Sequence, residues 1–493
     1  MTHTTTSHHA PAWGRMALSA TALLVLSACA NFSGISSSAK LIEPKAVGLA
    51  PQASQASADL PPLAAPLDAQ WWLAYQDSQL NTLITQALDS HPSLRVAQAR
   101  LARAQAVSQH AESNGAPQVN GSLDMTHQRF TATGMYPPPL AGSVNDTGTL
   151  QANASWELDF FGKNRSALDT ALGQARAAQA DAQAARMLLA SNVARTYFAL
   201  QRVNAQLAVA ERTLAQRTQS KALVQDRVNA GLDTQLELQQ SDSALPEARF
   251  QIEVLKEQQA LQLNMLAALT SQQNVPLAPT LTAQAAIEPI ALSQTIPLDL
   301  LGRRADIAAA RWRVEAASSD VANAKTLFYP NVNLVGFAGL SSIGFDKLLK
   351  NESQQWGVGP AIRLPIFEAG RLRANLKGKA ADLDAAIESY NALVIDAVRD
   401  VADQLASAKA IQRQRVEQAA AQASAEAAYA IATQRYKAGL GTYLNVLSAE
   451  TAVLAQRRQA VDLNARVLDT QIQLIRALGG GYSAEADSLH AAR

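Results

Sequence analysis

Residues 150–162 read LQANASWELDFFG. From Leu150 to Phe160, apolar side chains alternate with polar ones such as Gln151 and Glu157, which is the period of a β-strand with one apolar and one polar face. A run of about ten residues is the length of a tilted transmembrane strand. Nothing else in the chain supplies a core to cover the apolar face. We therefore predict a membrane strand here, rather than one layer of a soluble β-domain.

Three further segments show the same alternation. Val119 to Thr126 precedes a loop, residues 131–147, whose three consecutive prolines cannot continue a strand. Residues 332–340 and 356–366 repeat the arrangement later in the chain. We expect two membrane β-hairpins, at about 117–161 and 330–367. Aromatic residues near the strand ends are predicted to form a girdle at the lipid headgroups: Trp156, Phe160, Phe161, Trp356 and Phe367.

Long helices are predicted after each hairpin. No proline occurs from Gly162 to Leu245, or from Gly370 to the C-terminus. Residues 162–230 and 370–438 would each form a helix on the order of 100 Å long. Apolar positions recur at steps of four and three, the spacing of a coiled coil. The predicted seams are Val193, Thr196, Leu200, Val203, Leu207, Ala210 and Leu214 in the first half, and Leu440, Leu444, Leu447, Thr451, Leu454, Arg458, Val461, Ala465, Leu468, Ile472 and Ile475 in the second.

The two halves are copies of one unit. The series Arg227, Gly231, Leu232, Thr234, Leu236 recurs with identical spacing as Arg435, Gly439, Leu440, Thr442, Leu444. Each glycine can take the left-handed conformation that ends a helix, so each long helix is expected to turn back there. Thr234 with Glu237 forms a capping box for the returning helix, whereas Thr442 meets Asn445 instead.

The N-terminus has the layout of a bacterial lipoprotein signal. An apolar core over residues 16–25 leads to Leu26-Ser27-Ala28-Cys29, a lipobox whose thiol is acylated after cleavage. The alternative is a buried cysteine in an ordinary secretory signal. Ala30 after the cysteine favours the outer membrane. The predicted divisions are a signal at 1–28, a lipid-anchored linker at 29–67, repeat 1 at 68–270, a linker or equatorial segment at 271–296, repeat 2 at 297–478 and a disordered tail at 479–493.

Composition argues against several other functions. The formal net charge is +1, which gives no electrostatic footprint for nucleic acid. The sequence contains no HExxH, no paired CxxC and no GxxxxGK[ST], so we expect no metal site, no cofactor and no enzymatic activity. A lipid-anchored hydrolase remains an alternative for which no nucleophile and base can be named. A periplasmic lipid-anchored coiled-coil scaffold or adaptor would explain the helices but not the alternating strands.

Taken together, these features resemble the TolC-like outer-membrane efflux proteins, and specifically the lipidated NodT-type branch that serves resistance-nodulation-division or related tripartite pumps. The likeness covers nearly the whole mature chain. It rests on the stretches Trp71-Trp72, 158–162 (LDFFG), 300–307 (LLGRRADI), 328–330 (FYP), 364–367 (LPIF) and 435–439 (RYKAG). Ala305 stands at a position where the family's motif usually has proline.

The resemblance implies an α+β membrane protein, in which three chains share one twelve-stranded β-barrel continuous with a periplasmic α-helical barrel. Four strands alone cannot close a barrel, because an open edge leaves unpaired backbone in lipid. Oligomerisation is thus required by physics, while the number three comes from the family. The implied partners are a periplasmic adaptor (membrane fusion) protein and an inner-membrane pump.

The resemblance also implies roles for the two hairpin tips. Residues expected to dock the adaptor are Gly231, Leu232, Thr234, Gly439, Leu440, Gly441 and Thr442. Candidate gate residues are Tyr436, Lys437, Leu444 and Ser448. Ser448 stands where the family has an acidic residue, and Glu450 lies about 200° around the helix from it, so it is no obvious replacement. The alternatives are that the glycines serve only to reverse the helices and that Tyr436 is ordinary packing. Because Val228 and Asn229 replace Tyr436 and Lys437 at the first tip, gate chemistry is expected in the second copy.

Overall fold

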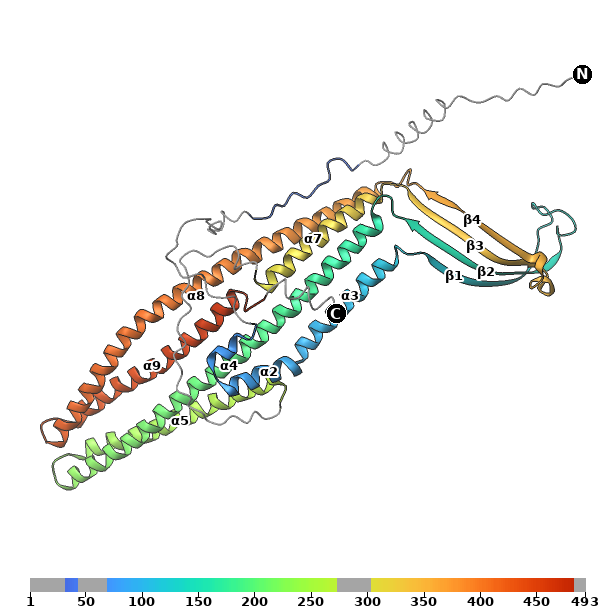
Figure 1. The fold of residues 1–493 in the computed structure, drawn as a ribbon. Helices are drawn as coiled ribbons and strands as arrows, with labels where there is room; N and C mark the ends of the chain where they lie inside the picture. Colours follow the sequence, from blue (N-terminus) through green and yellow to red (C-terminus); the bar gives the residue numbers. More distant parts are fainter. Residues whose placement is uncertain (1–31, 43–68, 273–302, 483–493) are drawn as a thin grey trace, which may run out of the picture. The chain divides into compact units, whose positions relative to one another are not determined.

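The computed structural model describes residues 32–42, 69–272 and 303–482 (Figure 1). The predicted signal with Cys29, residues 43–67 of the first linker, residues 273–296 of the second and residues 483–493 of the tail lie outside the described residues. Internal contacts divide the chain into two units. The first unit holds residues 100–178 and 310–390 with the N-terminal segment up to Leu41, and the second holds residues 42–99, 179–309 and 391–493.

The two copies have the same order of elements (Figure 1). In each, a helix of 22 residues precedes a β-hairpin, and a helix of 67 residues follows it. The first copy consists of α3 (Pro92–Ser113), β1 (Gln118–Arg129), β2 (Val144–Leu158), α4 (Lys163–Asn229) and α5 (Gln235–Thr270). The second consists of α7 (Ala305–Thr326), β3 (Asn331–Ile343), β4 (Gln354–Arg363), α8 (Arg371–Lys437) and α9 (Tyr443–Ala477).

The four strands form one antiparallel sheet in the order β1-β2-β3-β4. Its register aligns the apolar positions of all strands, since Ala154 of β2 lies opposite Val119 of β1 and Gly336 of β3. On the other face, Gln151 lies between Ser122 and Gly339. One face is therefore apolar across the whole sheet, and its larger side chains are exposed: Val119, Leu123, Met125, Leu150, Trp156, Leu334, Trp356, Val358 and Ile362.

The outer edges of β1 and β4 pair with no other strand of the part of the chain that the structure describes. The alternation read from sequence accounts for the two faces of β1 and β2, whereas β3 also carries Val335 and Phe337 on the face opposite to Leu334. The predicted α+β class is confirmed. No helix among the described residues is long and apolar enough to cross a membrane.

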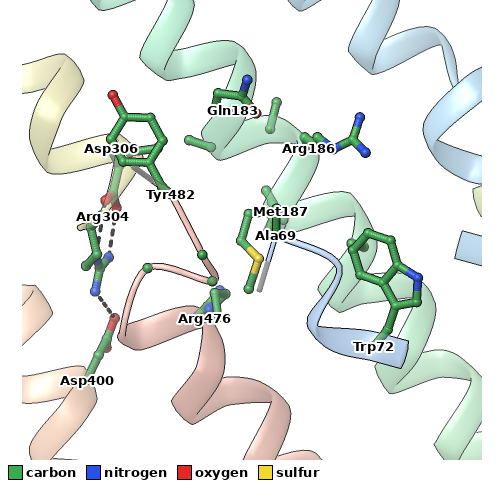
Figure 2. Close-up of a pocket in the computed structure, with 18 residues that line it drawn as sticks. Ala69, Trp72, Gln183, Arg186, Met187, Arg304, Asp306, Asp400, Arg476 and Tyr482 are labelled. Carbon is green, nitrogen blue, oxygen red and sulfur yellow. Dashed lines mark hydrogen bonds and ion pairs between the residues drawn. The ribbon is translucent and has the colours of Figure 1, made fainter. Parts of the chain in front are cut away.

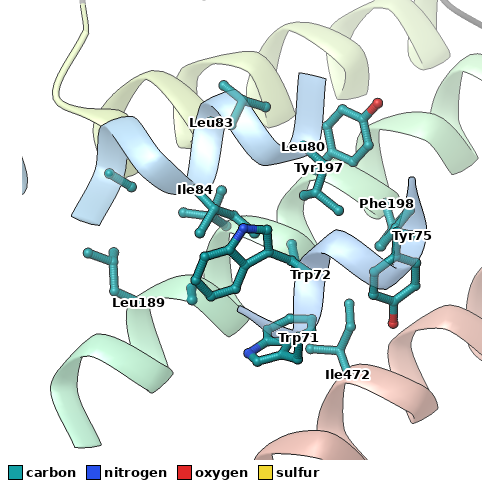
Figure 3. Packing of buried hydrophobic residues seen from close by; sticks show 14 of the residues in the cluster. Trp71, Trp72, Tyr75, Leu80, Leu83, Ile84, Leu189, Tyr197, Phe198 and Ile472 are labelled. Carbon is teal, nitrogen blue, oxygen red and sulfur yellow. The ribbon is translucent and has the colours of Figure 1, made fainter. Parts of the chain in front are cut away.

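The core of the second unit is built around the segment that precedes α3 (Figure 3). The short 3-10 helix η2 (Trp71–Tyr75) and helix α2 (Ser78–Ser90) bury their aromatic and aliphatic side chains against α4, α5 and α9. The Trp71 and Trp72 rings meet edge to face, with centroids 5.8 Å apart. Asp77 caps α2 through the N–H groups of Gln79 and Leu80, and it also accepts a 2.6 Å hydrogen bond from the Tyr197 hydroxyl of α4.

The predicted seam agrees with the buried stripe on α4 but not on the first turns of α9. Val193, Leu200 and Val203 are almost fully buried, as expected. The predicted seam residues Leu440, in the turn before α9, and Leu444, on α9, are instead 69% and 57% exposed. The residues buried there are Tyr443, Val446, Glu450 and Val453. The prediction was wrong because it followed the leucines, whereas the chain buries Tyr443 and Val446 and also Glu450, which has an ionic partner.

Two segments outside the repeats also differ from expectation. Residues 32–42, predicted as part of a linker, lie against α7 and α8, where Phe32 and Ile35 pack on a buried cluster that includes Phe328 and Leu376. Residues 479–482, predicted as part of a disordered tail, form the turn that ends α9, with the Gly480 N–H bonded to the Ile475 carbonyl at 3.0 Å. In both places side-chain or backbone partners exist that the Ala-, Ser- and Gly-rich composition does not reveal.

Candidate functional site at the hairpin tips

Both hairpin tips reverse the chain with the same backbone geometry. Gly231 has φ +73° and Gly439 has φ +72°, values that favour glycine. At each tip the following leucine N–H bonds back to an arginine carbonyl at 2.8 Å, Leu232 to Arg227 and Leu440 to Arg435. With the glycine N–H bonded to the carbonyl three residues before it, this is a Schellman motif, which satisfies the last carbonyls of the helix. The repeated Arg-x-x-x-Gly-Leu spacing encodes this turn.

The returning helices begin differently. Thr234 and Glu237 form the predicted capping box, with the Glu237 carboxylate accepting from the Thr234 N–H at 2.9 Å. The hydrogen bonds from Thr234 lower the pKa of Glu237. Thr442 occupies the N-cap of α9 without a side-chain capping bond. The first tip is therefore held more firmly at this point than the second.

The outer surface of both tips is apolar. Leu232 and Leu236 at the first tip are 66% and 63% exposed, and Leu440 and Leu444 at the second are similarly exposed. These four leucines occupy equivalent positions in the two copies. Lys437, Thr442 and Ser448 are exposed as well. The predicted docking residues thus lie on the surface of the tips, as do all the predicted gate residues except Tyr436.

Tyr436 is only 2% exposed and joins the two tips. Its hydroxyl donates a hydrogen bond to the Asp233 carboxylate of the first tip. The Arg227 guanidinium lies over its ring, 4.7 Å from the centroid, and also bonds Asp233, with Nε 2.9 Å from Oδ2. Around this trio, Val224, Tyr443 and Val446 form an apolar cluster. The polar partners of Tyr436, a residue of the second copy, thus both belong to the first copy.

Charges in this cluster are matched. Burial opposes ionisation of Asp233, but hydrogen bonds from Arg227 and Tyr436 outweigh it and lower the pKa of the carboxyl. Burial, and then the hydrogen bond to Asp233, raise the pKa of the Tyr436 hydroxyl. The arrangement is thus a neutral phenol and an arginine that share one carboxylate.

A second polar contact joins the two helical hairpins farther from the tips. Arg217 of α4 bonds Glu450 of α9 at 3.2 Å and the Ala244 carbonyl of α5 at 2.8 Å. The side chains of Arg217 and Glu450 are 10% and 6% exposed. Burial raises the pKa of Glu450, although Arg217 acts in the opposite direction. Glu450 is therefore turned toward the first hairpin, which agrees with the sequence-based view that it does not replace an acidic residue at Ser448.

A model of the outer membrane efflux protein family matches residues 83–272 and 296–480, which include both copies of the unit and both tips. The chain belongs to the outer membrane efflux protein family. It is an outer-membrane channel protein for efflux, as the family and its relatives are.

Two curated relatives and one solved structure illustrate the match. The multidrug resistance outer membrane protein MdtQ of Escherichia coli O157:H7 is 33% identical over 432 residues, covering 84% of this chain and 88% of that protein. The fusaric acid resistance protein FusA of Burkholderia cepacia is 37% identical over 375 residues, covering 74% and 69%. The crystal structure of the outer membrane protein VceC from Vibrio cholerae has a TM-score of 0.77 and 36% identity, covering 85% of this chain and 100% of that one.

The predicted girdle residues of this efflux channel are exposed, but they do not all lie at the same end of the sheet. Trp156 lies near the end of β2 that continues into α4, and its Nε1 donates to the Gly115 carbonyl at 2.9 Å. Phe160, Phe161 and Phe367 follow at the same end, beyond the strands. Trp356, opposite Ala338, lies nearer the other end of the sheet. All but one of the five residues thus mark the end of the sheet that joins the helices.

A cavity of about 430 Å³ in the second unit contains none of the predicted site residues (Figure 2). Arg304, at the start of α7, points between Asp306, bonded at 2.8 and 3.1 Å, and Asp400 of α8 at 3.6 Å. Arg476 and Tyr482 also line the cavity. No group of His, Cys, Asp and Glu side chains in the described ranges is arranged to hold a metal ion.

Sequence reasoning missed the polar partners Asp233, Arg217 and Glu450. One signal was present for Asp233, since it replaces Gly441 within an otherwise matching pair of tip sequences. Arg217 and Glu450 carry no comparable signal, because a charged residue on a long helix is usually solvated.

Proposed function

We propose that three copies of this chain form the lipid-anchored exit channel of a tripartite efflux pump, with the helical tips docked on a periplasmic adaptor that links them to an inner-membrane transporter. The observation that carries the proposal is the sheet. Its four strands share an exposed apolar face and have two unpaired outer edges. Lipid tolerates such a sheet only when the edges pair, so β1 of one chain must meet β4 of the next.

Three parts of the chain take separate roles in this proposal. Cys29 carries the lipid, and the exposed aromatic residues around Trp156 and Phe367 contact the headgroup region. The exposed leucines of the two tips form the docking surface for the adaptor. Small organic molecules are the cargo, in line with the names of the relatives, which refer to multidrug and fusaric acid resistance.

The tip cluster is proposed as the gate. Tyr436 and Arg227 both bind Asp233, and these contacts hold the second tip against the first. Opening would have to break a buried hydrogen bond and move the ring from beneath the guanidinium. Leu444 and Ser448, both exposed on α9, then face the path of the cargo.

Membrane fractionation tests the assembly. Recovery in the outer-membrane fraction as a trimer on an unheated gel, together with restored export of a drug in a strain that lacks its own channel, is the expected result. A Cys29→Ser variant should lose the lipid mass of the N-terminal peptide. Release by carbonate as a monomer would instead favour a peripheral scaffold and reject the channel assembly.

Permeability tests the gate. Replacing Tyr436 with alanine is expected to let vancomycin-sized solutes leak inward, because the bond to Asp233 is lost. Val416→Ala, an exposed change on the same helix, is the matched control. Unchanged permeability at normal trimer levels would show that Tyr436 is only packing.

A further inference from the structure

The N-terminal segment 32–42, which we call the strap, is bound by one carboxylate of α8. Asp384 accepts four hydrogen bonds from it: from the Ser37 hydroxyl at 2.5 Å, the Ser38 N–H at 2.9 Å, the Ser38 hydroxyl at 3.0 Å and the Ala39 N–H at 2.9 Å. The Ser37 bond and the others lower the pKa of Asp384 to about 2. An ionised side chain that accepts from two hydroxyls and two backbone amides of an extended segment is a built receptor for that segment.

Both ends of the strap are also fixed. Arg373 donates to the Ser33 carbonyl at 3.2 Å, and the Ile42 N–H donates to the Asn391 amide oxygen at 2.8 Å. These contacts advance along the strap and along α8 in the same direction. The nine-residue step on the strap spans about 30 Å when extended, and the eighteen-residue step on α8 rises about 27 Å. The strap therefore runs parallel to α8 with matched length.

Phe32, at the N-terminal end of the strap, packs on an apolar cluster, which we call the seat. Its ring meets Phe328 edge to face, with centroids 5.9 Å apart, and the same cluster contains Leu372 and Leu376. Phe328 lies between the end of α7 and the start of β3, and Leu372 lies in the first turn of α8, after β4. The strap thus begins where the helices of the first unit join the sheet.

Next to that seat lies an uncovered apolar surface, which we call the collar: Phe160, Phe161, Ile366 and Phe367. Phe160, Ile366 and Phe367 are 69%, 84% and 86% exposed. Phe161 stacks on Tyr329, the neighbour of Phe328, with centroids 4.9 Å apart. The strand ends that precede the two collar pairs lie at the same end of the sheet, since Leu158 lies opposite Val332 and Val332 lies opposite Ile362, so the collar lies beside the residues that seat Phe32.

We propose that the strap is a guide that delivers the acyl chains of Cys29 to the collar of the same chain, with Asp384 as its receptor. This rests on the proposed lipid attachment. Phe32 lies three positions after Cys29, a distance of at most about 11 Å along the extended chain. The acyl chains are the right occupant because the covalent chain limits them to this neighbourhood and because the collar is apolar. A tether without a receptor would leave the lipid free to insert anywhere within its reach.

Protease protection tests the receptor. Lys40 lies within the strap, so trypsin applied to the trimer in detergent cuts there only when the strap is released. Asp384→Ala should speed cleavage at Lys40 about tenfold or more. Asp384→Asn should have a smaller effect, because one amide oxygen can still accept three of the four bonds. Asp382→Ala, an exposed carboxylate on the same helix, should match the unmodified chain. Equal cleavage in all four proteins would overturn the proposal.

Crosslinking tests the destination of the lipid. Benzoylphenylalanine in place of Phe367 should capture the acylated N-terminal peptide on irradiation, and Asp384→Ala should reduce the yield about fivefold. No capture, or capture that ignores Asp384, would reject the guide. Mass spectrometry of the N-terminal peptide distinguishes failure of the lipid attachment from failure of the guide. An unacylated peptide rejects lipid attachment itself, whereas an acylated peptide that the collar never captures rejects only the guide.

Discussion

Replacing Arg217 with alanine should loosen α9 from the first hairpin. The change leaves Glu450, which is 6% exposed at its side chain, without its cationic partner at 3.2 Å. It also removes the donor to the Ala244 carbonyl. The remaining contact of Arg217, to Glu247, contributes little because that carboxylate is 67% exposed.

The magnitude follows from the burial of the pair. Removing one partner of a buried ion pair costs about 3–5 kcal/mol, because the other charge stays desolvated. That free energy corresponds to roughly two to almost four orders of magnitude in the equilibrium for local opening. Replacing both partners, as in Arg217→Met with Glu450→Leu, should be close to neutral, since it buries no unpaired charge.

Amide hydrogen exchange of peptides covering residues 443–454 measures this opening. Exchange should accelerate strongly in Arg217→Ala, recover in the double variant, and stay unchanged in Arg212→Ala, an exposed arginine on the same helix. The sign of the pH effect is also fixed. Burial raises the pKa of Glu450, so the folded state takes up a proton more readily, and the defect should shrink from pH 8 to pH 5. Equal exchange in Arg217→Ala and the unmodified chain, or no recovery in the double variant, would refute the reasoning.

Three other predictions concern the tips, the sheet and the cavity. Tyr436→Phe keeps the ring but removes a bond to a charged group, which weakens closure by about 1.5–3 kcal/mol and should raise vancomycin sensitivity; equal sensitivity at equal trimer level would contradict it. In Gly439→Ala the new Cβ meets open space and only the backbone is strained, so the trimer band on unheated gels should persist. In Gly339→Ala the new Cβ would lie 2.2 Å from the Leu150 carbonyl oxygen, so the trimer band should be lost. A lost band in Gly439→Ala and a normal band in Gly339→Ala would be inconsistent with the register. The pKa of Asp306 is lowered, because Arg304 outweighs the effect of burial. The ionised Asp306 therefore stabilises the fold above the usual carboxyl pKa of 3.8, and this stabilisation is lost as the pH falls through the lower pKa of the folded state. Asp306→Asn should flatten the acid end of a plot of melting temperature against pH.

Much of the fold was predictable because the units are long and strictly periodic. The break at Gly162 predicted where β2 gives way to α4, and the glycines at 231 and 439 predicted where α4 and α8 end. Repetition helped further, since each helix or strand in one copy has a counterpart of similar length in the other. The prediction failed on the first turns of α9, where hydrophobicity alone pointed to Leu440 and Leu444 while the chain buries Tyr443 and Glu450.

The sequence by itself determined the period of each segment, the positions of the turns and the need for strand partners, because these follow from interactions between near neighbours along the chain. Only the tertiary structure decided the polar contacts that join distant segments. Arg217 and Glu450 are separated by 233 residues, Tyr436 and Asp233 by 203, and Ser37 and Asp384 by 347. Each of these side chains, read on its own helix or loop, looks like a solvated surface residue. Its role depends on a distant partner of opposite charge or complementary hydrogen bonding that only the fold brings close. The local periodicity of the sequence does not indicate that partner.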